Sequence, residues 1–106
     1  MRSVMVRYTV KEGHAERNEE LIRAVYRELD ERAPGGLRYA TFRLEDGLSF
    51  VHLAQVEGEE NPLQQLTAFR AFTAGIGERT EEPPLTSALR EIGSYRLFPT
   101  CTQEES

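Results

Sequence analysis

The sequence predicts a single α+β domain of the ferredoxin-like type, in which an antiparallel sheet carries two helices on one face. Three observations predict the element order β-α-β-β-α-β. Residues 3–10 alternate between apolar and polar side chains, residues 14–33 repeat apolar side chains at helical spacing, and two further alternating runs meet at a short turn. The length of 106 residues suits one domain. We place this domain at residues 1–98 and a polar tail at residues 99–106.

The first strand and the first helix have the clearest patterns. Apolar side chains occupy every second position of residues 3–10, as in a strand with one buried side. In the helix expected at residues 14–33, acidic side chains come early and Arg27 and Arg32 come late, an order that suits the helix dipole. The run Pro34-Gly35-Gly36 is expected to end this helix. Its apolar stripe comprises Asn18, Leu21, Ile22, Val25, Tyr26, Leu29 and Ala33.

A hairpin of two strands is expected at residues 37–45 and 48–57. Asp46-Gly47 between two alternating runs indicates a two-residue type I′ turn, which needs positive φ at both positions. A loop of this length fixes the register, so that Thr41 lies opposite His52.

The remaining elements have weaker boundaries. A second helix is expected at residues 63–79, after the start signal Asn61-Pro62. The last strand is expected at residues 91–98, and an earlier start near Thr86 remains an alternative.

The alternation of the hairpin separates a mixed face from an apolar face, and neither face is suited to water. Two helices on one side of a monomer cover only one of them, and exposed apolar area of this size marks an interface. We therefore expect a homodimer that meets through the apolar face. Periodicity leaves open the alternative, in which the helices cover the apolar face and the mixed face stays partly wet. The mixed face comprises Tyr39, Thr41, Arg43, Phe50, His52, Ala54 and Val56, and the apolar face comprises Ala40, Phe42, Leu44, Val51 and Leu53.

Charge and cysteine content exclude several classes of function. The net charge is −5 and the 13 basic residues are scattered, so neither a nucleic acid nor an anionic membrane surface is an expected partner. No apolar run is long enough to span a bilayer, and the charged, alternating N-terminus does not resemble a signal peptide, so we expect a cytoplasmic protein. The single cysteine, Cys101, lies in the tail and is expected to be an exposed bystander.

Three segments carry a family resemblance: the strand FVHLAQVE at residues 50–57, the segment LTAFRAF at residues 66–72 and the closing EIGSYRL at residues 91–97. With these and its element order, the chain resembles the antibiotic biosynthesis monooxygenase family, whose members form dimeric α/β barrels. The resemblance implies a pocket between the sheet and its own helices. It also implies cofactor-free oxygenation of phenols, quinols or anthrones, so no cofactor is expected.

A haem-degrading branch of the same family uses an Asn, a Trp and a His. The matching positions here hold Val6, Val56 and Thr73, so haem degradation is not expected. The two histidines lie far apart without carboxylates at metal-binding spacing, so no metal site is expected either.

The leading hypothesis is a cofactor-independent monooxygenase that acts on a small aromatic, phenolic or quinol compound. His52 is the candidate base or proton shuttle, because histidine titrates in the useful range. Arg43 and Tyr39 are candidates to orient the substrate. The candidate binding residues are Tyr8, Asn18, Thr41, Phe50, Phe69 and Phe72.

Each candidate also has a structural interpretation. His52 would then be bonded to Thr41 across the strands, Arg43 would be a solvated or salt-bridged charge, and the aromatic side chains would be core residues. The alternative functions are a non-catalytic small-molecule-binding or stress-associated dimer with the same pocket, and a purely structural dimer without a cavity.

Overall fold

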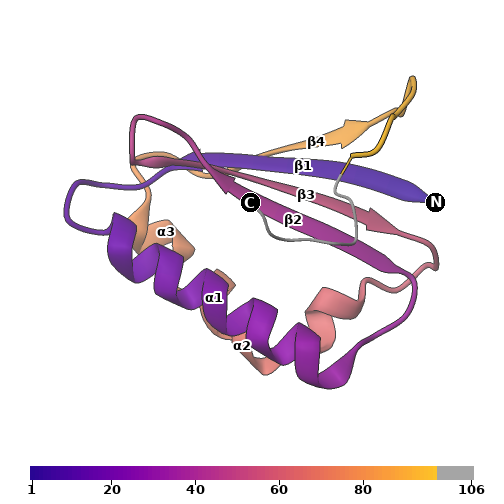
Figure 1. Ribbon diagram of the computed structural model, residues 1–106. Coiled ribbons are helices and arrows are strands. Elements are labelled where there is room, and N and C mark those ends of the chain that lie inside the picture. The colour runs from indigo at the N-terminus through magenta and orange to yellow at the C-terminus, as the bar shows by residue number, and fades with distance from the viewer. Residues whose placement is uncertain (98–106) are drawn as a thin grey trace.

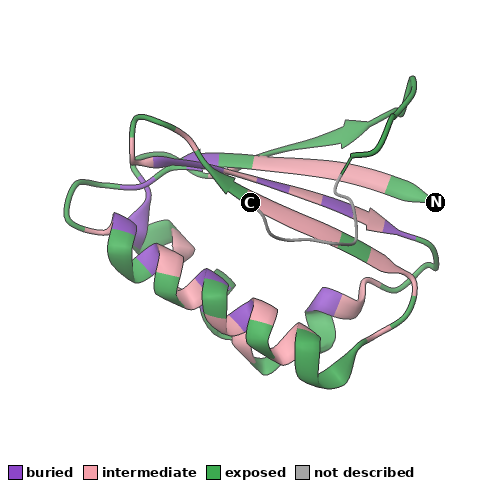
Figure 2. Ribbon diagram, viewed as in Figure 1, coloured by how far each residue is buried: buried purple, intermediate pink, exposed green. Residues whose placement is uncertain are grey.

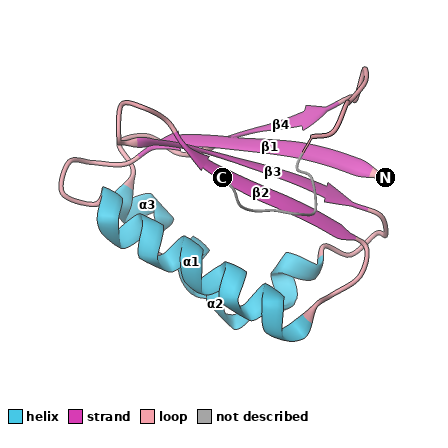
Figure 3. Cartoon of the chain, viewed as in Figure 1, coloured by secondary structure: helices cyan, strands magenta, loops and turns pink. Residues whose placement is uncertain are grey.

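The computed structural model describes residues 1–97, and in it the strands form one antiparallel sheet in the order β2-β3-β1-β4 (Figure 1). All the helices of the described residues lie on the same face of this sheet (Figure 3). The strands are β1 (Arg2–Thr9), β2 (Leu37–Arg43), β3 (Ser49–Val56) and β4 (Leu85–Leu89). The helices are α1 (Ala15–Arg32), the 3₁₀ turn η1 (Pro62–Gln65), α2 (Thr67–Ala74) and α3 (Ile76–Arg79). The predicted ferredoxin-like α+β fold is therefore confirmed.

Helix α1 begins after His14 and ends at Arg32, so that one residue, Ala33, separates it from the Pro-Gly-Gly run. Ala33 closes it in the left-handed region, with φ 45° and ψ 55°, and its N–H donates to the carbonyl oxygen of Leu29 at 2.7 Å. Glycine is the usual residue at such a position, because a side chain there is strained. The sequence predicts where the helix stops but not this strained alanine.

The hairpin register is as predicted, with Thr41 paired to His52. The predicted type I′ turn is wrong, because Gly47 has positive φ at 77° and Asp46 does not. Instead the carboxylate of Asp46 accepts hydrogen bonds from the backbone N–H groups of Leu48 and Ser49, both at 2.8 Å. These bonds stabilise a longer loop, which an aspartate can form with its own backbone.

The single helix expected at residues 63–79 is divided into η1, α2 and α3. The chain is extended at Leu66, with φ −85° and ψ 130°, and α2 ends at Gly75. The carboxylate of Glu28, on α1, accepts hydrogen bonds from the first N–H groups of α2, at 3.2 Å from Thr67 and 2.8 Å from Ala68. This cap from another element holds α2 against α1.

The last strand lies at Leu85–Leu89, so the prediction of a strand at residues 91–98 is wrong over residues 91–97. Residue 98 and the predicted tail, with Cys101, lie outside the described residues. Strand β4 pairs with β1 at the edge of the sheet, where Thr86 lies opposite Val6. All of its residues are exposed in the single chain, and its sequence, LTSAL, has no strict alternation of apolar and polar side chains.

Figure 2 shows buried residues both in the strands and in the helices, and the mixed face contributes Phe50 to the core cluster that includes Ile22 and Val25 of α1. Phe50, His52, Ala54 and Val56 of β3 are all buried there, so the alternative of a wet mixed face is excluded. On the opposite, apolar face, Phe42 is 43% exposed in the single chain. The hydrophobic core therefore lies between the sheet and the helices. Within residues 1–97, none of the helices has the length and apolar character needed to cross a membrane.

Candidate functional site

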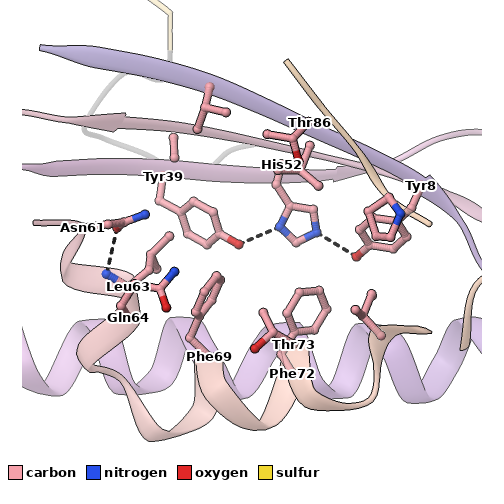
Figure 4. A pocket seen from close by; sticks show the side chains of 15 residues that line it. Tyr8, Tyr39, His52, Asn61, Leu63, Gln64, Phe69, Phe72, Thr73 and Thr86 are labelled. Atoms are coloured by element: carbon pink, nitrogen blue, oxygen red, sulfur yellow. Dashed lines mark hydrogen bonds between the residues drawn. The ribbon is translucent and has the colours of Figure 1, made fainter. Parts of the chain in front are cut away.

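A cavity of about 350 Å³ lies between the sheet and the helices (Figure 4). This volume is within the range of small-molecule sites. The sheet side of the cavity carries Tyr39, His52 and Tyr8 in a row, and the rings of Phe69 and Phe72 face this row from α2. The described residues that line it are Val4, Val6, Tyr8, Tyr39, His52, Ala54, Asn61, Leu63, Gln64, Phe69, Phe72, Thr73, Ile76, Pro84 and Thr86.

None of these lining side chains is an acid, a lysine or an arginine. Apart from the row on the sheet, the polar groups are two amides at one end, Asn61 and Gln64, and the hydroxyl groups of Thr73 and Thr86. An apolar wall with a few convergent polar groups is typical of a site for a small uncharged molecule.

His52 is held between two tyrosine hydroxyl groups. Its Nε2 lies 2.8 Å from Oη of Tyr8, and its Nδ1 lies 2.6 Å from Oη of Tyr39. Oγ1 of Thr41 lies farther from Nδ1, at 3.3 Å. Both ring nitrogens of the imidazole are therefore engaged by phenolic hydroxyl groups, and all three side chains line the cavity.

The pairing of the strands produces this row. Val6 lies opposite His52 on β1, and Thr41 lies opposite it on β2. Tyr8 is two positions beyond Val6 and Tyr39 is two positions before Thr41, so both tyrosines are diagonal neighbours of the histidine on the same face. Diagonal neighbours on paired strands are within reach of aromatic side chains.

A buried hydrogen-bond network continues behind Tyr8. The amide Nδ2 of Asn18 donates to Oη of Tyr8 at 3.0 Å, and Nε of Arg79 donates to Oδ1 of Asn18 at 2.9 Å. Nη2 of Arg79 also donates to the carbonyl oxygen of Phe72 at 2.9 Å. Asn18 is fully buried and Arg79 is 7% exposed, so the network runs through the interior.

Burial shifts the pKa values of the row. It lowers the pKa of His52 to about 4, so the imidazole is neutral at pH 7. It raises the pKa of Tyr8 to about 12, although the bond from Asn18 and the charge of Arg79 act in the opposite direction. Burial also raises the pKa of Tyr39. The row is therefore three neutral groups, each able to donate and accept hydrogen bonds.

The structure brings together five of the nine predicted site residues at the cavity wall: Tyr8, Tyr39, His52, Phe69 and Phe72. Asn18 and Thr41 support the row from behind. Phe50 belongs to the core, where it stacks on Tyr8 with ring centroids 5.6 Å apart.

Arg43 has the salt-bridged position of its structural interpretation and does not lie where a substrate-orienting residue would be needed. Its guanidinium contacts the carboxylates of Glu19 at 2.8 Å and Glu16 at 3.4 Å, both on α1. It is exposed and does not line the cavity. The two acids hold it away from the row, so we do not retain it in the site.

Sequence reasoning missed Arg79 and the two amides. Arg79 follows Phe72 by seven residues, a spacing that places both on one face of the helix expected at residues 63–79. This spacing could have indicated that Arg79 lies on the same side of the helix as the predicted site residue Phe72. Gln64 lies in η1 and Asn61 lies directly before it. The position of η1 over the cavity is set by tertiary packing, which the sequence pattern does not show. In residues 1–97 no group of three or more His, Cys, Asp or Glu side chains is arranged to hold a metal ion.

Comparisons with known proteins agree with this fold. Rv0793 from Mycobacterium tuberculosis has a TM-score of 0.70 at 18% identity, over 88% of this chain and 96% of that chain. PA3566 from Pseudomonas aeruginosa has a TM-score of 0.70 at 21% identity, over 87% and 94%. SnoaB, a cofactor-independent oxygenase from Streptomyces nogalater, has a TM-score of 0.64 at 14% identity, over 92% and 96%.

Sequence comparison is more specific about the family. No curated protein gives a significant match. The family profile for antibiotic biosynthesis monooxygenases matches residues 1–74, which include β1, α1, the hairpin and most of the cavity wall. The chain therefore belongs to the antibiotic biosynthesis monooxygenase family.

Proposed function

We propose that this protein is a cofactor-independent monooxygenase that acts on a small, uncharged phenolic or quinol compound bound in the cavity. The observation that carries the proposal is the row Tyr39–His52–Tyr8, which lines one wall of an otherwise apolar cavity. Membership of the family and the likeness in fold to SnoaB support an oxygenase.

The reaction is a four-electron oxidation of the substrate by dioxygen. A base removes the phenolic proton, and the resulting anion transfers one electron to dioxygen. The substrate radical and superoxide then combine to form a C–O bond at a ring carbon. The peroxide O–O bond breaks and the carbon loses its hydrogen, so that a quinone and one water molecule are the products. One oxygen atom thus enters the substrate and the other leaves as water.

The residues of the cavity have distinct roles in this proposal. Neutral His52 accepts the substrate proton, and the Tyr8 hydroxyl group, which lies 2.8 Å from Nε2, conveys it from the cavity that both residues line. Phe69 and Phe72 contact the aromatic ring of the substrate. Asn61 and Gln64 bind its polar substituents at the far end.

The proposal includes a homodimer that meets through the apolar face of the sheet. In the single chain, Val51 and Leu53 are only half-buried and Phe42 is exposed on this face. A standard interface buries about 1,600 Å² in total, which two such sheets can supply. The helices already occupy the opposite face, so the cavity and the interface do not compete.

Oxygen uptake by the pure protein tests the oxygenase. We expect uptake with members of a panel of quinols and anthrones, and a fall of about 100-fold or more in kcat for His52→Ala, because the proton acceptor is lost. His14→Ala is the matched control, since His14 lies at the start of α1 away from the cavity. Uptake that is equal in His52→Ala would exclude His52 as the base.

The low pKa of His52 favours a second candidate function, a binding protein without turnover. A group with a pKa of about 4 is a weak base, and a buried neutral imidazole between two phenols is also a good hydrogen-bonding surface. This candidate predicts that quinones and phenols bind to the protein, with a change in tyrosine fluorescence, while oxygen uptake stays at the background rate. Ala54→Leu, which narrows the cavity, is expected to weaken binding in either case.

A further inference from the structure

The hydrogen bonds behind the cavity have a fixed direction, which begins at Arg79. A guanidinium has only donors, so Oδ1 of Asn18 must be the acceptor at 2.9 Å and Nδ2 must be the donor on the other side of the amide. Nδ2 then donates to Oη of Tyr8 at 3.0 Å. The second bond of Arg79, to the carbonyl oxygen of Phe72, holds the guanidinium in place. The amide of Asn18 therefore cannot turn over without loss of a buried bond.

This direction continues to the imidazole. Tyr8 accepts from Asn18, so its own proton is available for Nε2 of His52, which lies 2.8 Å away. If the Tyr8 proton goes to Nε2, this nitrogen accepts and the proton of the neutral ring lies on Nδ1. That Nδ1–H group would donate to Oη of Tyr39, which lies 2.6 Å away. Tyr39 then keeps its hydroxyl proton, which a ligand oxygen in the cavity can accept in place of the side chain of Thr41.

We propose that Arg79 and Asn18 are positioning residues that fix the His52 tautomer with its proton on Nδ1, and so make Tyr39 a hydrogen-bond donor to an oxygen atom of the bound ligand. Neither residue lines the cavity, and both are buried, with Asn18 fully inaccessible to solvent. A polar pair in such a position is costly unless every bond is made, and this network satisfies the acceptor of Asn18 and the hydroxyl group of Tyr8.

With the proton of His52 on Nδ1, Tyr8 transfers a proton and Tyr39 donates a hydrogen bond to the ligand. This difference between the two tyrosines rests on the proposed function. On the Tyr8 side, the ligand O–H bond breaks, its proton joins Oη of Tyr8, and the original Tyr8 proton moves to Nε2. This leaves a ligand anion and an imidazolium. On the Tyr39 side, the hydroxyl group donates to a carbonyl or phenolate oxygen of the ligand. The ligand class is thus an aromatic molecule with one ionisable O–H group and one acceptor oxygen.

Nitrogen NMR of the ¹⁵N-labelled protein measures the tautomer directly, without substrate or turnover. The unliganded protein at mildly alkaline pH is expected to show Nε2 of His52 as an unprotonated ring nitrogen and Nδ1 as a protonated one. The signals of His14 are identified with the variant His14→Gln. A proton on Nε2 of His52 would overturn the proposal, whereas a correct tautomer without oxygen uptake would overturn only the proposed oxygenase.

The variant Asn18→Asp reverses the direction of the network without a change in size. Its carboxylate accepts from both Arg79 and Tyr8, so Tyr8 must accept from the imidazole, and the proton is expected to move to Nε2. Gln65→Glu is the matched control, because it also introduces a carboxylate but at an exposed position outside the network, and it is expected to keep the proton on Nδ1. An unchanged tautomer in Asn18→Asp would show that these residues do not set it.

A second variant decides the case if Asn18→Asp does not fold. Arg79→Met removes the donor that orients the amide, and both tautomers of His52 are then expected to appear in the spectrum. A single Nδ1–H tautomer in Arg79→Met would contradict the positioning role of Arg79.

Discussion

Oη of Tyr39 lies 2.6 Å from Nδ1 of His52, closer to the imidazole than either Tyr8 or Thr41. The ring of Tyr39 also stacks on Tyr26, with centroids 5.2 Å apart and an interplanar angle of 17°. Tyr39 is therefore held both through its hydroxyl group and through its ring. This arrangement fixes a polar atom at the cavity wall with little freedom left to lose when a ligand binds.

Removal of the Tyr39 hydroxyl group tests its contact with the ligand. In Tyr39→Phe we expect kcat/KM to fall roughly 10–100-fold, because a hydrogen bond to an ionised group is worth about 1.5–3 kcal/mol. The ring and its stacking on Tyr26 remain, so the fold is expected to persist. The check is the ratio of kcat/KM for Tyr39→Phe to that for the control Tyr95→Phe, which loses an exposed hydroxyl group outside the cavity. Equal values in the two variants would show that Tyr39 does not contact the ligand.

His52 makes the free energy of unfolding depend on pH. Its pKa in the folded chain is about 4, against a reference value of 6.5, so the unfolded chain binds the proton more readily. The stabilising contribution is complete above the unfolded pKa and is lost as the pH falls from 6.5 toward 4. The predicted loss over this window is roughly 3 kcal/mol.

The groups that contact the imidazole do not oppose this shift. Tyr8 on β1 and Tyr39 and Thr41 on β2 are neutral, and Arg79 beyond Asn18 is a cation. Urea denaturation at several pH values measures the effect, with His52→Gln as the variant in which the slope should be smaller. A residual slope is expected near the acidic end, because hydrogen bonds from Ala68 and Thr67 lower the pKa of Glu28 from 4.5. A slope between pH 6.5 and 4 that is the same in His52→Gln would assign it to other groups.

The left-handed alanine at the end of α1 offers a stabilising substitution. Ala33 has φ 45°, and a side chain in this region costs about 1–2 kcal/mol. Glycine removes this strain but makes the unfolded chain more flexible, so Ala33→Gly is expected to raise the free energy of unfolding by roughly 0.5–1 kcal/mol. The control Ala24→Gly, inside the same helix, should lower it by about 1 kcal/mol. Denaturation midpoints compare the two, and a lower midpoint for Ala33→Gly would contradict the strain.

The proposed dimer interface predicts a change of mass in solution. A charge at Leu53, on the apolar face, would be buried without a partner in the dimer, so Leu53→Glu is expected to be monomeric. Sedimentation should give twice the chain mass of 12.1 kDa for the natural sequence and a single chain mass for the variant. Gln65→Glu, an exposed change on the helix side, should leave the dimer intact. A natural protein that sediments as a monomer would remove the dimer from the proposal.

The alternation of the strands made much of the site predictable. It assigned Tyr39, His52 and Tyr8 each to one face of its own strand, and the pairing of β1, β2 and β3 then brought these faces together as one face of the sheet. It also separated the mixed face from the apolar face. Local patterns failed where the decisive contact is tertiary. Arg43 is drawn from the site by acids on α1. The strand β4 is defined by its pairing with β1 rather than by an alternation of its own.

The most direct measurement of the central claim is a reaction under dioxygen labelled with a heavy isotope, followed by mass spectrometry of the product. A quinol or anthrone that supports oxygen uptake should yield a quinone that carries one labelled oxygen atom. His52→Ala should yield little labelled product, and His14→Ala as much as the natural protein. A product without label, formed with hydrogen peroxide, would identify an oxidase and contradict the proposed monooxygenase.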